Sequence, residues 1–207
     1  MHSKHKDNSL QLQYFLCDLF VLSCESKFMM KQLKKFNPDQ LKTVNDSVAI
    51  AEELVSNFYK MSEAQWLHRR YDVKTLVDLC PDETTDGPFA QIVRYKGRLK
   101  DTSLSSSTYD FYKICLQDHS ILAALKQSPG MELFLFILYI IVHELIHIVR
   151  FSKFIQSFDA SCEERNMEEK RVHEETREIL SSVRIAGLAD VLKFYSKWHA
   201  SFDRLRN

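Results

Sequence analysis

The chain has 207 residues, of which 45% are hydrophobic and 27% are charged, as is usual for a soluble globular protein. Its 28 lysines and arginines balance its 28 aspartates and glutamates, which argues against a nucleic-acid partner. Glycine and proline number four each, together about 4% of the chain against a usual share of about 12%. Because so few turn-forming residues cannot support many hairpins, we expect a mainly α fold, with a single helical domain over residues 1–207.

The five cysteines are widely spaced and form no CxxC pair: Cys17, Cys24, Cys80, Cys115 and Cys162. Their odd number and their spacing argue against a disulfide framework and against a cysteine zinc knuckle. We therefore expect free thiols in a reducing, cytoplasmic compartment.

Residues 10–36 are expected to form a first amphipathic helix. Lys4 and Lys6 precede the apolar run 14–22, which is also how an export signal begins. Because Asp18 lies inside that run, we favour the helix and keep the export signal as the alternative.

Residues Asn37-Pro38-Asp39-Gln40 predict the start of a second helix. Asn37 can cap it, Pro38 suits the first helical position, and Gln40 can reach back to the cap. The apolar residues that follow recur every three or four positions and should face a partner helix: Leu41, Val44, Val48, Ala51, Val55 and Phe58.

The middle of the chain mixes helical and extended patterns. Residues 62–80 are predicted to form one or two short helices, followed by a polar loop over 81–88. Segments 89–99 and 109–116 are strand candidates and would form a small two-stranded β element. Residues 89–95 of the first segment could be a sheet edge that binds an extended peptide. A helix capped by Asp118 or Ser120 should then run to Gln127.

The most apolar segment predicts a long helix over 131–158. Its uninterrupted apolar run, 133–142, is half of the about 20 residues that a membrane span needs. Because His143, Glu144 and His147 follow directly, we predict a buried central helix and no membrane span. A glutamate-rich helix over 162–186 and an amphipathic helix over 188–202 complete the predicted bundle.

The central helix carries the motif His143-Glu144-Leu145-Ile146-His147, an HExxH. Residues i and i+4 share a helix face, so both imidazoles can bind one metal ion. Glu144 lies about 100° around the helix, where it can act as a general base on a water molecule. Three ionisable groups on an apolar helix would be costly to bury without partners, and a metal ion would offset that cost. The competing interpretation is a pair of hydrogen-bonded core histidines with a salt-bridged Glu144.

On these residues the chain resembles the zincin superfamily of HExxH metallopeptidases. The resemblance covers residues 133–180 and implies one zinc ion per chain, with His143 and His147 as ligands and Glu144 as the catalytic base. The extended metzincin pattern does not fit, because it requires Gly and His where this chain has Arg150 and Lys153. A ligand from a downstream helix, as in the glutamate-type zincins, is then expected.

Two residues on the downstream helix are candidates for the third metal ligand. Glu169 and His173 lie one turn apart on one flank of its apolar stripe. Glu169 would complete a His-His-Glu site, and His173 would complete a three-histidine site. The sequence leaves this choice open.

The leading functional interpretation is a zinc-dependent metallohydrolase, most simply a metallopeptidase, acting on a peptide or small-molecule substrate. The first alternative is a di-iron helical bundle, because Glu144 and His147 also form an ExxH motif, although Glu169 and His173 are one residue too far apart for a second. The second alternative is a non-catalytic protein whose metal holds helices together. The substrate and the oligomeric state are left open.

Overall fold

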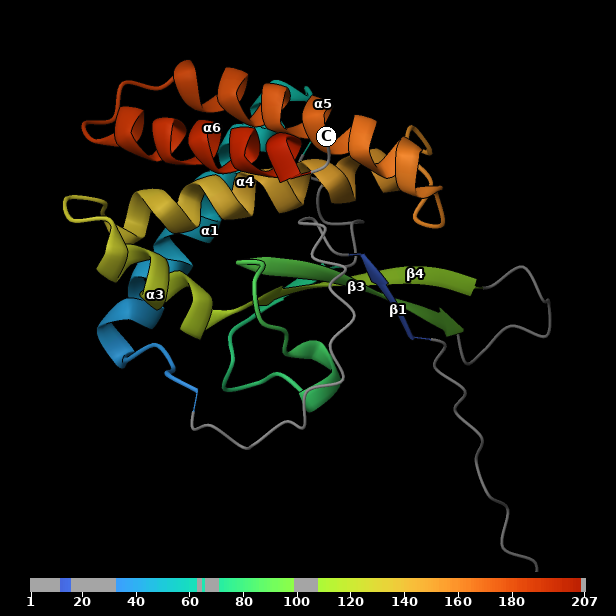
Figure 1. Cartoon of the computed structure of the whole chain (residues 1–207). Coiled ribbons are helices and arrows are strands. Elements are labelled where there is room, and N and C mark those ends of the chain that lie inside the picture. Colours follow the sequence, from blue (N-terminus) through green and yellow to red (C-terminus); the bar gives the residue numbers. More distant parts are fainter. Residues whose placement is uncertain (1–11, 16–32, 63–64, 66–70, 99–107, 206–207) are drawn as a thin grey trace, which may run out of the picture.

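The computed structural model describes residues 12–15, 33–62, 65, 71–98 and 108–205 (Figure 1). The described chain is mainly helical, as predicted. Its helices are α1 (Pro38–Phe58), α3 (Asp118–Gln127), α4 (Leu133–Ser152), α5 (Cys162–Ser181) and α6 (Leu188–Leu205). Its strands are β1 (Leu12–Phe15), β2 (Tyr71–Lys74), β3 (Ala90–Arg98) and β4 (Thr108–Leu116), with a short 3-10 turn, η1, at Pro81–Glu83.

The strands form one mixed sheet in the order β1-β3-β4-β2. The two predicted strands are present as β3 and β4, which pair antiparallel from Ala90↔Leu116 to Arg98↔Thr108. The prediction that the sheet has only two strands is wrong. β2 also pairs with β4, in parallel, and β1 pairs with β3, antiparallel. β3 is consequently not a sheet edge, since β1 pairs along Ile92–Tyr95.

Both additional strands replace expected helix. Residues 71–74 were expected to be helical and instead pair with β4, with Val73 opposite Ile114. Residues 12–15 lie in the expected first helix and instead pair with β3, while 16–32 lie outside the described residues. A strand of four residues carries too little periodicity to outweigh a neighbouring helical pattern, and its partner is far away in sequence.

The helices cover one face of the sheet, and α4 lies at the centre (Figure 1). α4 packs against α1, α5 and α6 and contacts β3. On the sheet, Ile92 and Ile114 are fully buried, and the Tyr112 ring stacks on Phe151 of α4 with ring centroids 5.7 Å apart. The core is therefore built around α4, whose residues from Leu135 to Phe151 are all buried.

The opposite face of the sheet is covered by the segment that contains η1. Glu83 of η1 is 1% exposed, and its carboxylate accepts hydrogen bonds from Lys113 at 2.6 Å, from the Cys80 backbone at 2.9 Å, and from the Tyr95 hydroxyl. Its backbone carbonyl accepts from the Gln91 and Gln117 side-chain amides. Glu83 thus fixes this segment to β3 and β4.

The predicted helix starts are confirmed in part. Asn37 and Gln40 form the expected capping box at α1. α3 spans the expected residues, but Asp118 does not cap it. Its buried carboxylate instead accepts hydrogen bonds from the backbone amides of Phe36 and Leu76, both at 2.9 Å, and joins two distant segments.

α4 ends at Ser152, six residues before the expected 158. In the described part of the chain, it is the one helix long and apolar enough to cross a membrane, and 89% of its most apolar window is buried inside the fold. A core helix of a soluble protein gives the same pattern. Among the described cysteines, Cys80, Cys115 and Cys162 are free thiols, as expected.

Candidate metal centre

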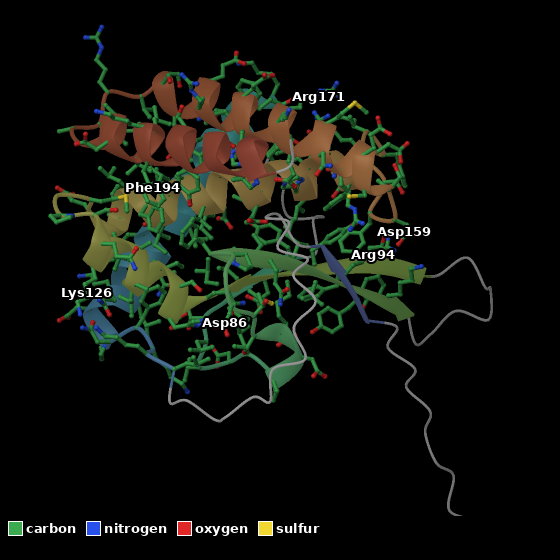
Figure 2. All side chains as sticks on the ribbon, viewed as in Figure 1. Asp86, Arg94, Lys126, Asp159, Arg171 and Phe194 are labelled. Carbon is green, nitrogen blue, oxygen red and sulfur yellow. The ribbon has the colours of Figure 1, made fainter. Side chains whose placement is uncertain are left out.

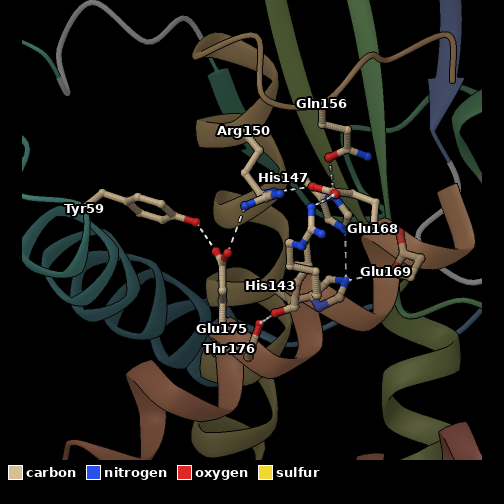
Figure 3. A network of polar contacts seen from close by, with 11 residues as sticks. Tyr59, His143, His147, Arg150, Gln156, Glu168, Glu169, Glu175 and Thr176 are labelled. Atoms are coloured by element: carbon tan, nitrogen blue, oxygen red, sulfur yellow. Dashed lines mark hydrogen bonds and ion pairs between the residues drawn. The ribbon is translucent and has the colours of Figure 1, made fainter. Parts of the chain in front are cut away.

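Three buried side chains converge between α4 and α5 (Figure 3). The Nε2 atoms of His143 and His147 are 3.3 Å apart. The Glu169 carboxylate places one oxygen 3.4 Å from His143 Nε2 and the other 3.2 Å from His147 Nε2. Within the described residues, this is the one group of three or more His, Cys, Asp or Glu side chains whose ligand atoms are close enough to hold a metal ion.

The positions of these residues follow from the two helices. His143 and His147 are one turn apart on the face of α4 that meets α5. On α5, Glu169 belongs to the buried stripe that continues through Val172 and Thr176, so packing of that stripe directs Glu169 toward α4. Ser161 and Glu164 form a capping box that fixes where α5 begins.

The site is strongly desolvated. His147 is 0% exposed, His143 4% and Glu169 8%. Burial, with a further contribution from the negative charge of Glu168, raises the pKa of Glu169 well above its usual range. Burial also lowers the pKa of His147. Without a cation the neutral forms are therefore favoured, and neither Glu169 oxygen accepts a hydrogen bond from the described residues.

His173 lies beside this group rather than within it. Its ring centroid is 4.2 Å from that of His143, and its Nδ1 is 2.8 Å from the Tyr139 hydroxyl. Of the two candidates for a third ligand, the structure brings Glu169 to the histidine pair and holds His173 against Tyr139.

Glu144 is buried, 3% exposed, and lies about 100° around α4 from His143 and one turn before His147. It lies two turns before Phe151, which stacks on Tyr112 of β4, so the same side of α4 faces the sheet. Its negative charge acts to raise the pKa of His147, against the larger lowering by burial. Glu144 is thus close to the histidine pair along α4, at a helix position that it shares with Phe151.

A charged network that the sequence did not predict lies next to the site. Arg150 pairs with Glu168 and, at 2.9 Å, with Glu175, which in turn accepts a hydrogen bond from Tyr59 of α1 (Figure 3). The network joins α1, α4 and α5, and it fixes the residue that precedes Glu169. The sequence signal for this network is Arg150, a charged residue on a largely apolar helix, one turn after His147.

A second contact orients the outer side of His147. Its Nδ1 is 3.2 Å from Oε1 of Gln156, which lies in the connection between α4 and α5. Further along that connection, Asp159 pairs with Arg94 of β3 at 2.9 Å (Figure 2). The connection is therefore attached both to the site and to the sheet.

Comparisons of this chain with protein-family models, with curated proteins and with solved structures found no match.

Proposed function

We propose that the protein is a zinc-dependent metallohydrolase, most simply a metallopeptidase. In this proposal His143, His147 and Glu169 hold one zinc ion and Glu144 is the general base. The observation that carries it is the convergence of three buried ligand side chains: the two histidine Nε2 atoms are 3.3 Å apart, and each has one Glu169 oxygen at 3.2 or 3.4 Å. It is supported by the resemblance of residues 143–147 to the zincin motif.

The spacing of the donor atoms suits a tetrahedral ion. Zinc binds imidazole nitrogen and carboxylate oxygen at roughly 2.0–2.1 Å, which places tetrahedral ligands about 3.3 Å apart. The Nε2–Nε2 separation of 3.3 Å matches that spacing, and each Nε2 has one of the two Glu169 oxygens at 3.2 or 3.4 Å. Two neutral imidazoles and one carboxylate from two helices are also a donor set found in catalytic zinc sites, which keep a fourth position open.

A cation also accounts for the burial of Glu169. A carboxylate without a hydrogen-bond donor in an apolar interior is costly to ionise. Metal ligation compensates that charge, as it does for other buried carboxylates. This argument supports metal binding and does not depend on which metal is bound.

The proposed chemistry needs only one contribution from the metal. Bound zinc supplies a Lewis acid that lowers the pKa of water to about 7. Glu144, adjacent to His143 on the sheet side of α4, would take up a proton at its carboxylate and deliver it to the leaving group. In this proposal His173, whose Nδ1 is 2.8 Å from the Tyr139 hydroxyl and whose ring is near that of His143, would contact a substrate oxygen.

The second candidate is a non-catalytic site in which metal joins α4 to α5. The observation that favours it is the burial of all three ligands, with His147 completely enclosed. Structural zinc sites contribute folding free energy directly.

Metal analysis and a peptidase assay separate these functions. Purified wild type should contain one zinc per chain by mass spectrometry, and His143→Ala should lose most of it. Two irons per chain would favour the di-iron alternative, and no metal would contradict the proposal. Glu144→Gln should keep its zinc and lose cleavage of a casein or quenched-peptide panel by about 10²–10⁴-fold. Zinc binding without cleavage of peptides or esters by wild type would favour the structural site.

A further inference from the structure

We propose that Gln156 is a positioning residue for the metal centre, which fixes the tautomer and ring orientation of His147. The inference rests on the proposed metal binding. Gln156 comes from the connection after α4 and is 9% exposed. Its Oε1 lies 3.2 Å from Nδ1 of His147, on the side of the ring opposite to Glu169 (Figure 3).

The direction of this hydrogen bond decides which nitrogen can bind a metal. A carbonyl oxygen only accepts, so Gln156 Oε1 selects the tautomer of His147 that carries its proton on Nδ1. The lone pair is then on Nε2, the atom that lies 3.2 Å from Glu169 and 3.3 Å from His143. The opposite amide orientation would favour a proton on Nε2, where it would block ligation.

The remaining half of the Gln156 amide makes no contact that would explain its burial. Its Nε2 is buried and makes no hydrogen bond with the described residues. A glutamine buried only to stabilise the fold would be expected to use both ends of its amide, because an unsatisfied buried donor costs about 1–3 kcal/mol. Within the described residues, the side-chain hydrogen bond of Gln156 is thus the one to His147.

The backbone is bent so that Gln156 can return to α4. Phe154 adopts a left-handed conformation with φ 55°, and the amide of Ile155 donates to the Arg150 carbonyl at 2.9 Å. Glycine is the usual residue at this position of a helix end. Phe154 is 93% exposed, so its side chain does not compensate the conformation by packing. What the turn achieves is to reverse the chain and bring Gln156 back over His147.

The segment that follows Gln156 is attached to the sheet. Asp159 pairs with Arg94 at 2.9 Å, and the Arg94 guanidinium lies 4.4 Å from the centre of the Phe158 ring. Both ends of the segment around Gln156 are thereby fixed, one to α4 and the other to β3. A fixed segment can hold the imidazole in one orientation.

The test compares Gln156→Met, which keeps size but removes the acceptor, with Gln156→Glu, which keeps a stronger one. Zinc affinity is measured by chelator competition, and the visible spectrum of the cobalt-substituted protein reports ligand geometry. Gln156→Met should bind zinc about 10–100-fold more weakly with an altered cobalt spectrum. Gln156→Glu should restore affinity to wild type or above.

Gln117→Met is the matched control, because Gln117 is also buried and hydrogen-bonded but contacts Glu83 on the far face of the sheet. It should leave zinc affinity unchanged. If wild type binds no metal, the proposed function fails before Gln156 is tested. If wild type binds zinc and Gln156→Met binds it equally well, or Gln156→Glu is as weak as Gln156→Met, the inference on Gln156 is overturned.

A measurement on the wild-type apoprotein requires no variant to fold. Two-dimensional ¹⁵N NMR of the imidazole rings distinguishes the two neutral histidine tautomers. His147 should carry its proton on Nδ1. A proton on Nε2 would contradict the role assigned to Gln156, whatever the metal content of the protein.

Discussion

Two buried glutamates on opposite faces of the sheet have opposite surroundings. Glu83, 1% exposed, receives hydrogen bonds from Lys113, Tyr95 and a backbone amide. Burial raises its pKa, but these hydrogen bonds together outweigh burial and leave the pKa below its ordinary value. Glu169, 8% exposed, has no such donors among the described residues, and burial raises its pKa well above that value.

The contrast separates a carboxylate whose charge is balanced within the fold from one that, in the proposed function, would bind a metal ion. The carboxylate of Glu83 is already neutralised by Lys113 inside the chain, so its site is complete. Among the described residues, Glu169 lies against the two histidines, at 3.4 and 3.2 Å, and burial disfavours its charged form. A bound cation would stabilise that charge. Functional residues often lower the stability of the protein when its ligand is absent.

The largest effect is expected when the uncompensated carboxylate is removed. Glu169→Gln should lose more than the roughly 100-fold in zinc affinity expected for residues that act through a ligand, because a ligand itself is lost. The same change should stabilise the apoprotein by about 0.5–2 kcal/mol, because a neutral amide costs less to bury. Chelator competition and thermal unfolding in EDTA measure the two effects. If the Glu169→Gln apoprotein is less stable than the wild-type apoprotein, this difference between Glu169 and Glu83 is contradicted.

The corresponding change at Glu83, on the other face of the sheet, should destabilise the protein. Glu83→Gln leaves the Lys113 ammonium, whose side chain is 18% exposed, without its counter-charge. We expect a loss of about 3 kcal/mol in the free energy of unfolding, at the low end for a broken buried pair. Urea denaturation measures it, and zinc affinity per folded chain should not change. A loss of zinc affinity as large as that of Glu169→Gln would show that the two faces are coupled.

The two glutamates should also give opposite dependences of stability on pH. The pKa of folded Glu83 is below its ordinary value of 4.5, so its contribution is complete above that pH and is lost as the pH falls further. The pKa of folded Glu169 is raised, so the apoprotein should lose stability as the pH rises above 4.5. Urea denaturation of the apoprotein across pH measures both. Glu83→Gln should remove the loss of stability at low pH. Glu169→Gln should remove the loss of stability as the pH rises above 4.5.

Features with a local signal were predicted correctly from the sequence. The capping residues Asn37 and Gln40 and the apolar stripe behind them determine α1, and the long apolar run determines α4. β1 and β2 could not be predicted in the same way, because four residues become a strand only through partners elsewhere in the chain.

The candidate site also combines residues that have a local sequence signal with residues that depend on tertiary packing. The i,i+4 spacing brought out His143 and His147 as a pair. Glu169 and His173 are one turn apart on α5, so only the packing of α5 on α4 separates their positions. Gln156 gave no signal at all, because the predicted helix continued to 158. Helix ends are usually marked by glycine, and here a phenylalanine occupies the left-handed position.

The smallest effect is expected from a substitution of Phe154. Phe154→Gly should stabilise the protein by about 0.5–1 kcal/mol, because glycine adopts the left-handed conformation without strain. Little packing is lost, since the side chain is 93% exposed. Phe154→Ala is the matched control, since it removes the ring but keeps the Cβ, and it should give no gain. Zinc affinity should be unchanged in Phe154→Gly, because the turn that brings Gln156 to His147 is preserved. If glycine destabilises the protein in thermal unfolding, the ring has a packing role and the turn is not maintained at a cost.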